Sequence, residues 1–395
     1  MPPNTLSPAK DLRIAAAQLY DGSSNAPLQD VVIEVQQSRI AAITPRQGDV
    51  DLQVAIAAPG FIDLQINGAN DVQFNDQTDA AAVAEIAQGA RQGGSAHILP
   101  TFITDEGIRY QQAVAAVAEA RAAGTPGIAG VHLEGPFLSP NRPGIHPPHC
   151  IRPLGAEDMQ FLQASAADGT CGTLLLTLAP ECTAAGQIRR LNDAGVTVFA
   201  GHSAASHAEM QSAIREGLRG ATHLWNAMSP LTSREPGVVG AVLAARQLYA
   251  GIIADGVHVD FANVGIAARL MPDHLCLVTD AMLTLAGTTT QFQIHGVEIH
   301  RDGNRLSDAK GTLAGAHLAM DEALRNMVQQ VGIPLPQALR MAAGNPARAI
   351  GRPDLAQIRQ GAAASLTFLT QDLGAIGTLA DGQLHLTQDT PHVAA

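Results

Sequence analysis

The chain has 395 residues, enough for a large domain with additions, and 46% of them are hydrophobic. The 36 acidic residues outnumber the 24 basic ones and give a net charge of −12, which argues against nucleic acid or an anionic membrane as the main partner. The start is not signal-like, no apolar run approaches about 18 residues, and the four cysteines lack CxxC spacing. We therefore expect a reduced, soluble, cytoplasmic protein.

The two ends of the chain share one pattern. Residues 11–58 alternate and turn like antiparallel strands, and residues 355–390 do the same. We predict a small β-sandwich domain built from residues 1–58 and 352–395, beside a catalytic domain at 59–351.

Between these ends, eight short apolar runs recur, each followed by an Ala-rich, helix-like segment. Near-continuous apolar strands that alternate with helices indicate a parallel sheet covered on both faces. Eight such units favour a (β/α)₈ TIM-like barrel over an open sheet. The runs are PGFIDLQING (59–68), HILPTFIT (97–104), GIAGVHLEGPF (127–137), GTLLLTLAPE (172–181), TVFAGHS (197–203), GATHLWNAM (220–228), YAGIIADGVHV (249–259) and HLCLVTDAM (274–282).

One stretch after the eighth run interrupts this alternation. QFQIHGVEIHRDGNRL lies between Ala286 and Leu313, and its HG and DG pairs predict a hairpin-like excursion.

Polar residues fall where the predicted strands end. In a (β/α)₈ barrel the C-terminal strand ends build the active site. A lone histidine there is more often a hydrogen-bonded structural residue, but acid or imidazole groups at five matching ends indicate a functional site. They are Glu134, His202, His223, His258 and Asp280.

Two imidazoles and a carboxylate form a ligand set that suits one divalent first-row ion with an open position. We predict that Glu134, His202 and His223 hold it, with zinc favoured and iron, cobalt or nickel as alternatives. Otherwise Glu134 would pair with an arginine such as Arg142. Asp280 is predicted to be the general base for a water activated by the metal; its alternative role is to cap a loop.

Lysine is scarce, which removes two other barrel chemistries. Lys10 precedes the predicted barrel and Lys310 lies in the excursion after its last strand. Neither a carboxylated lysine that bridges two metals nor a Schiff-base lysine is therefore available at a strand end.

Several motifs together resemble the amidohydrolase superfamily, and within it the deacetylases of phosphorylated amino sugars. They run in family order from about residue 59 to 351: PGFIDLQING with VQFND, HLEGPF, PGIHPP, GHSAAS, ATHLWNAM, REPG, GIIADGVHVD, LVTDAM, GTLAGAHLAM and NPARAIG. The resemblance implies metal-dependent hydrolysis of the acetamide of N-acetyl-D-glucosamine 6-phosphate, which yields D-glucosamine 6-phosphate and acetate.

The resemblance assigns roles at the matching positions. It makes Glu134, His202 and His223 the metal ligands. Asp280 would activate water and then protonate the leaving amine. His146 in PGIHPP, otherwise a solvated loop histidine, would help to polarise the acetyl carbonyl.

The phosphate contacts are also implied by the resemblance alone. Asn226, Ala227 and Arg234 would hold the phosphate, and Arg234 would reach across the interface of a homodimer; without the resemblance it would be read as a surface residue. His258 would contact sugar or phosphate, and the region of Leu313 would close over the substrate. The other residues expected around the substrate are Gln65, Ile145, Asp255, Ala314 and Gly315.

The chain departs from the superfamily pattern at the end of the first strand. Many members carry HxH there, whereas this chain has Asp63, Leu64 and Gln65. An amide is a poor metal ligand, so we predict a single metal ion per chain.

Three alternatives to this function stay open. A related phosphorylated N-acyl amino sugar could be the substrate. A deaminase or cyclic amidase would keep the metal set without needing REPG and HLWNAM. A non-catalytic scaffold would usually have lost a ligand or the aspartate of strand eight.

Overall fold

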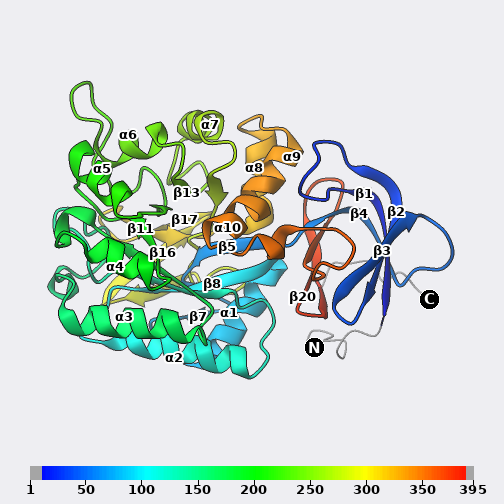
Figure 1. The fold of residues 1–395 in the computed structure, drawn as a ribbon, viewed down its shortest axis with the longest axis horizontal. Helices are drawn as coiled ribbons and strands as arrows, with labels where there is room; N and C mark the ends of the chain where they lie inside the picture. Colours follow the sequence, from blue (N-terminus) through cyan, green and yellow to red (C-terminus); the bar gives the residue numbers. More distant parts are fainter. Residues whose placement is uncertain (1–10, 388–395) are drawn as a thin grey trace.

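The computed structural model describes residues 11–387, which form a barrel and a smaller β unit side by side (Figure 1). Both chain ends contribute to the β unit, as expected. Lys10 and the outer ends of the expected spans 1–58 and 352–395 lie outside the described residues, so this division of the chain stays a prediction.

The eight predicted strands form one sheet of eight, in the order β14-β13-β12-β11-β10-β9-β8-β5. Every residue of the first two strands is buried, which explains why their sequences are apolar without alternation. The strands are β5 (Phe61–Ile66), β8 (Ser95–Ile103), β9 (Gly130–Glu134), β10 (Thr173–Leu178), β11 (Thr197–Ala200), β12 (Gly220–Ala221), β13 (Tyr249–Ile252) and β14 (Leu275–Leu277).

A helix follows each strand. Side chains that accept backbone N–H groups begin several of them: Asp79 accepts from Ala82, and Ser206 accepts from Glu209. The helices are α1 (Ala80–Gln92), α2 (Arg109–Ala122), α3 (Ala156–Asp168), α4 (Gln187–Asp193), α5 (His207–Arg215), α6 (Gly237–Ala244), α7 (Phe261–Leu270) and α8 (Met320–Gln329). Three shorter helical pieces follow α8: α9 (Leu335–Leu339), a π-helical turn (Arg340–Gly344) and α10 (Asn345–Ala349). Short 3₁₀ helices lie at Pro148–Cys150, Pro180–Cys182 and Pro353–Ala356.

The sheet closes between its first and last strands. The Asp280 N–H donates to the Gln65 carbonyl over 2.9 Å, and the Asn67 N–H donates to the Ala281 carbonyl over 2.8 Å. An isolated parallel bridge joins Ile66 to Ala281. The predicted barrel is therefore confirmed, and the open sheet is excluded.

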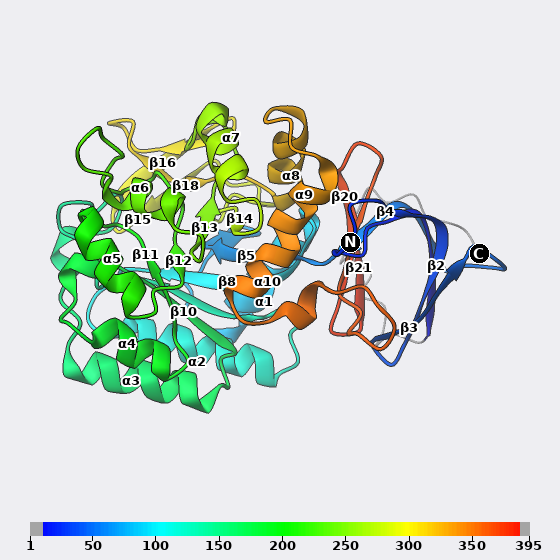
Figure 2. The same ribbon diagram turned by 45° about the horizontal axis from the view of Figure 1, so that its top comes forward.

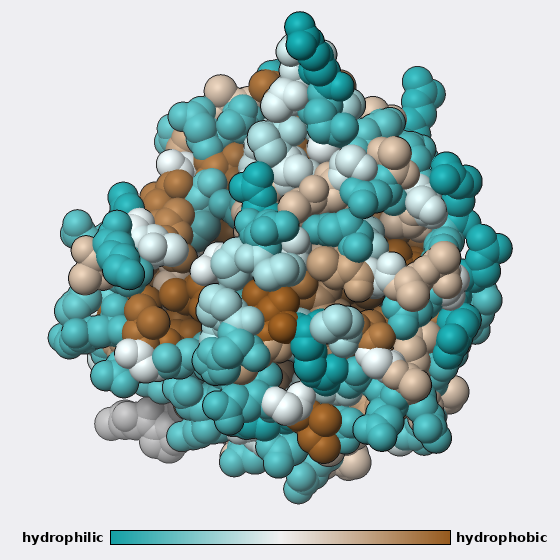
Figure 3. Space-filling model, turned by 90° about the vertical axis from the view of Figure 1, so that its left-hand side faces the viewer, coloured by the Kyte–Doolittle hydropathy of each residue, from teal (hydrophilic) through white to brown (hydrophobic). Residues whose placement is uncertain are grey.

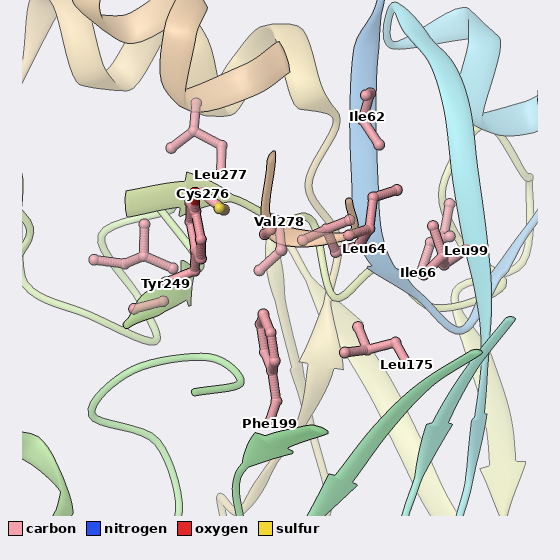
Figure 4. Close-up of a cluster of buried hydrophobic side chains, with 14 of the residues drawn as sticks. Ile62, Leu64, Ile66, Leu99, Leu175, Phe199, Tyr249, Cys276, Leu277 and Val278 are labelled. Atoms are coloured by element: carbon pink, nitrogen blue, oxygen red, sulfur yellow. The ribbon is translucent and has the colours of Figure 1, made fainter. Parts of the chain in front are cut away.

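The main hydrophobic core lies within and around this barrel. Figure 4 shows part of it, with labelled side chains that come from six of the strands. Continuous burial on both faces fixes the strand ends relative to one another, which is what an active site at the barrel mouth requires.

The β unit is one sheet of seven strands, in the order β21-β20-β19-β4-β1-β2-β3. The antiparallel pairing of β4 with β19 joins the two ends of the chain. Figure 2 shows that the sheet bends, so that β2 and β3 lie opposite β20 and β21; a separate apolar cluster includes Ile33, Leu366 and Phe368. The strands are β1 (Leu12–Leu19), β2 (Leu28–Gln36), β3 (Arg39–Pro45), β4 (Leu52–Pro59), β19 (Leu366–Leu369), β20 (Ala375–Ala380) and β21 (Gln383–Leu386).

The predicted excursion is a small antiparallel sheet next to the barrel mouth. It consists of β15 (Gln291–Ile294), β16 (Val297–Asp302), β17 (Arg305–Ser307) and β18 (Leu313–Ala316), and its apolar side chains form a third cluster with Ile103 and Met282. Lys310 lies exposed in the turn before β18. None of the described helices has the length and apolar content needed to cross a bilayer.

Candidate active site

The polar residues predicted from the strand ends converge on one cavity. Glu134 is the last residue of β9, His202 and His223 each follow a strand by two residues, and Asp280 follows β14 by three. All four line a cavity of about 450 Å³, a size typical of small-molecule sites. Figure 3 shows the end of the molecule away from the β unit, where hydrophilic residues surround separate hydrophobic patches.

Three of these residues have an uncommon backbone conformation. The φ angles of His202, His223 and Asp280 are +46°, +30° and +49°, in the left-handed region that non-glycine residues rarely occupy. Such conformations cost about 1–3 kcal/mol each and cluster at functional sites. Here the left-handed conformation directs the three side chains into the cavity. A regular continuation of each strand would direct them elsewhere.

Glu134, His202 and His223 meet within hydrogen-bonding distance of one another. Glu134 Oε1 lies 3.0 Å from His202 Nε2 and 2.9 Å from His223 Nε2, and the two Nε2 atoms are 3.1 Å apart. Burial raises the pKa of Glu134, but the hydrogen bonds from the two histidines outweigh it and hold the pKa well below its usual range. In the described part of the chain no ion pair joins Glu134 to Arg142, so the predicted alternative is not what the structure contains.

The proton positions in this cluster favour a cation. His202 Nδ1 lies 3.0 Å from the carbonyl oxygen of Arg142, which can only accept, so Nδ1 carries a proton. In the neutral ring, Nε2 then presents a lone pair to the carboxylate of Glu134. Two acceptors in contact need a proton or a metal ion between them.

His146 joins the same cluster. Ligand atoms of Glu134, His146 and His202 all lie within 4.8 Å of one another, and the rings of His146 and His202 are 4.2 Å apart. The Nδ1 atoms of His146 and His223 are buried without a partner among the described residues. A carboxylate and three imidazoles fit a divalent first-row ion.

Asp280 is held by two side-chain amides, one from the end of β5 and one from the residue that follows it. Its Oδ1 accepts from Asn67 Nδ2 over 2.7 Å and from Gln65 Nε2 over 3.1 Å; Gln65 Nε2 also lies 3.2 Å from Glu134 Oε2. Both bonds to Asp280 fall on Oδ1, which leaves Oδ2 for a proton. Burial, and then the charge of Glu134, raise the pKa of Asp280 to about 6.

The contact from Asn67 was not predicted. Gln65 lies in β5 and Asn67 directly follows this strand, and both side chains reach the same oxygen of Asp280. Their spacing makes them the pair that occupies the HxH positions, rather than Asp63 and Gln65. Asp63 lies deeper, accepts from the Thr279 hydroxyl over 2.5 Å, and has its pKa raised to about 7 by burial.

The strand-seven loop presents His258 to the cavity. His258 Nδ1 lies 2.7 Å from Asp255 Oδ2, and Asp255 Oδ1 accepts the backbone N–H groups of Val257 and His258. Asp255 itself does not line the cavity. It therefore orients the His258 ring, with Nε2 on the cavity side.

The other expected substrate residues fall into two groups. Five line the cavity: Ile145, Asn226, Ala227, Leu313 and Gly315. The rest do not: Gln65 and Ala314 are buried, and Arg234 is exposed on the loop before α6.

A closed barrel with buried carboxylates and imidazoles at its mouth defines the class of barrel hydrolases that work with a metal ion. Residues 56–385 match the model of the Amidohydrolase family. The chain belongs to this family, as the sequence motifs indicated.

Individual relatives carry the comparison further. An N-acetylgalactosamine-6-phosphate deacetylase of Shewanella sp. (strain ANA-3) is 40% identical over 326 residues, 82% of each chain. An N-acetylglucosamine-6-phosphate deacetylase of Haemophilus influenzae is 37% identical over 367 residues, 90% of this chain and 95% of the relative. Among solved structures, the N-acetylglucosamine-6-phosphate deacetylase of Pasteurella multocida superposes with a TM-score of 0.90 at 34% identity and covers 96% of this chain and 100% of its own.

Proposed function

We propose that this enzyme hydrolyses the acetamide of N-acetyl-D-glucosamine 6-phosphate and releases D-glucosamine 6-phosphate and acetate. The observation that carries the proposal is a buried carboxylate, Asp280, in the same cavity as the Glu134 and histidine cluster. The names of the relatives, both deacetylases of N-acetylhexosamine 6-phosphates, support it.

We infer that Glu134, His202 and His223 hold one divalent ion, of which zinc is favoured and iron, cobalt and nickel are alternatives. When bound, such an ion would polarise the acetyl carbonyl and lower the pKa of a water molecule. The Nε2 lone pair of His202, and the 2.9 Å approach of His223 Nε2 to the same carboxylate oxygen, support this ligand set. His146, whose ligand atom lies within 4.8 Å of those of Glu134 and His202, would donate to the acetyl carbonyl oxygen or serve as a further ligand.

Asp280 then moves the proton. Its Oδ2 takes a proton from the attacking water as the new C–O bond forms. The same carboxyl returns the proton to the sugar nitrogen as the C–N bond breaks. One group can serve in turn as base and acid because the steps are sequential.

Recognition of the phosphate must be local, because the chain carries a net charge of −12. Asn226, Ala227 and His258 line the cavity and can contribute to it. Arg234 is exposed and does not line the cavity of its own chain, so its role in phosphate binding requires the homodimer that the family resemblance implies, in which it reaches the site of the second copy. Four free cysteines, Cys150, Cys171, Cys182 and Cys276, support a reducing, cytoplasmic setting.

The 40% identical relative favours a second substrate, the C4 epimer N-acetyl-D-galactosamine 6-phosphate. The test is acetate release from both sugar phosphates, from unphosphorylated N-acetylglucosamine, and from a cyclic amide. We expect the phosphorylated N-acetyl sugars to be hydrolysed and the other two to be poor. Hydrolysis of the cyclic amide alone would refute the proposal.

A further inference from the structure

The cavity has an apolar wall that the catalytic roles leave unexplained. Ile103, Ile145, Met282 and Leu313 all line it. Ile103 and Met282 are buried, and they belong to the third apolar cluster, which the excursion sheet completes. The acyl carbon chain is the part of an N-acyl sugar phosphate that carries no polar atom, so it is the part of the substrate that an apolar wall suits best.

Two of these side chains flank the reacting groups. Ile103 is the register partner of Glu134 across β8 and β9. Met282 follows Asp280 by two residues, and its N–H donates to the Ala316 carbonyl over 3.0 Å. The carbonyl carbon must lie between the Glu134 cluster and Asp280 to react. The first carbon of the acyl chain is bonded to that carbon, so it would lie beside Ile103 and Met282.

The positions of the substituents on the sugar ring also direct the acyl group toward Ile103. The nitrogen on C2 and the C6 phosphate branch leave opposite positions of a six-membered ring. Asn226 and Ala227 follow strand six (β12), and Ile103 ends strand two (β8). These two strands lie opposite each other in an eight-stranded barrel. A phosphate near strand six therefore directs the acyl group toward Ile103.

Met282 has little freedom to withdraw from this position. Gly315 has a φ of +63°, and a Cβ built there would lie 2.5 Å from Met282 Sδ. The thioether therefore rests directly on the glycine backbone of β18. On its other side, Gln73 Nε2 lies 4.0 Å from the sulfur.

We propose that Ile103 and Met282 form an acyl pocket that sets the length of the N-acyl chain the enzyme accepts. The proposal rests on the proposed deacetylase function. The pocket has space for the methyl of an acetyl group and excludes longer chains. An apolar site commonly discriminates by roughly 10- to 200-fold for each methylene.

The test uses N-acetyl, N-propionyl and N-butyryl glucosamine 6-phosphate. All three release the same amine, so one assay of glucosamine 6-phosphate gives kcat/KM for each. We expect Met282→Ala and Ile103→Ala to raise the butyryl-to-acetyl ratio by about tenfold or more. Leu283→Ala is the matched control, because Leu283 is buried in the same cluster but does not line the cavity. It should leave the ratio unchanged.

If an alanine variant does not fold, Ile103→Val measures the same ratio with a smaller change in volume. A wild-type enzyme that releases acetate, with a ratio unmoved in the folded Ile103 and Met282 variants, would overturn the acyl pocket alone. A wild-type enzyme that releases no amine from any of the three would overturn the proposed function, and the pocket with it.

Discussion

Asn67 gives the sharpest test of how Asp280 is held. Its Nδ2 donates to Asp280 Oδ1 over 2.7 Å, which is shorter than the 3.1 Å bond from Gln65 to the same oxygen. Asn67→Ala removes the shorter bond and leaves the ligands Glu134 and His202 untouched. The variant should therefore bind metal normally and turn over slowly.

The expected loss of kcat follows from the strength of the hydrogen bond between Asn67 and Asp280. A hydrogen bond to a charged group contributes about 1.5–3 kcal/mol, and each 1.4 kcal/mol corresponds to roughly tenfold in rate. Gln65 still holds Oδ1, so the fall in kcat should lie near the lower end, about tenfold. The donor also lowers the pKa of Asp280, which burial raises to about 6. Because a general base acts only when deprotonated, activity falls as the pH drops through this pKa. Removal of the Asn67 donor raises the pKa of Asp280, so the variant should lose activity at a higher pH than the wild type.

The assay is kcat/KM for acetate release between about pH 5 and 9, together with the metal content of each protein. Asn345→Ala is the control. Asn345 is a buried amide that donates to the carbonyl oxygen of Leu275 over 2.7 Å, at the far end of the strand that leads to Asp280. It should lower stability without moving the acidic limb. An acidic limb in Asn67→Ala that coincides with that of the wild type would refute the assigned role.

Three further changes test the other roles. Asp280→Asn should fold and keep its metal but lose about 10²- to 10⁴-fold in kcat; half of the wild-type rate would mean that another group is the base. Elemental analysis should give close to one metal equivalent per chain, and two equivalents required for activity would contradict a single ion. The His146→Ala variant should keep this metal content if His146 polarises the carbonyl and should lose metal if His146 is a ligand. Arg234→Ala should lower kcat/KM by roughly 30- to 1,000-fold for the phosphorylated sugar and little for N-acetylglucosamine, whereas equal losses would assign Arg234 to the fold or the dimer.

The barrel could be predicted because burial leaves a direct record in the sequence. Strands covered on both faces must be apolar throughout, and the number of such runs, each followed by a helical segment, gives the number of strand–helix units. The shortest strand of the barrel, β12, has only Gly220 and Ala221, and the run GATHLWNAM that predicts it begins at this strand and continues into the following loop. The excursion was readable for the same kind of reason: its turn residues, HG and DG, coincide with His295–Gly296 and with Gly303.

The contacts within the site were less accessible to prediction. Asn67 precedes a glycine, and an Asn-Gly pair indicates a turn more often than a site residue. Its role depends on the closure of strand one against strand eight, which pattern alone does not place. His146 lies in an irregular loop, and it reaches the cluster because the Ser139 N–H donates to the His202 carbonyl over 2.9 Å and folds the loop back.

The direction of the strand-one hydrogen bonds bears on the number of metal ions. An ion beside strand one would need Glu134 Oε2 and Asp280 Oδ1 as ligands. Gln65 and Asn67 already direct N–H groups at these two oxygens, over 3.2 Å and 2.7 Å. Imidazole lone pairs at the same positions would attract a cation, whereas amide N–H groups replace one. Two buried carboxylates with neutral imidazoles carry a charge of about −2, which a single divalent ion balances. The amides of strand one therefore fit a site with one ion, and exchanging them for histidines is the change that would make room for a second.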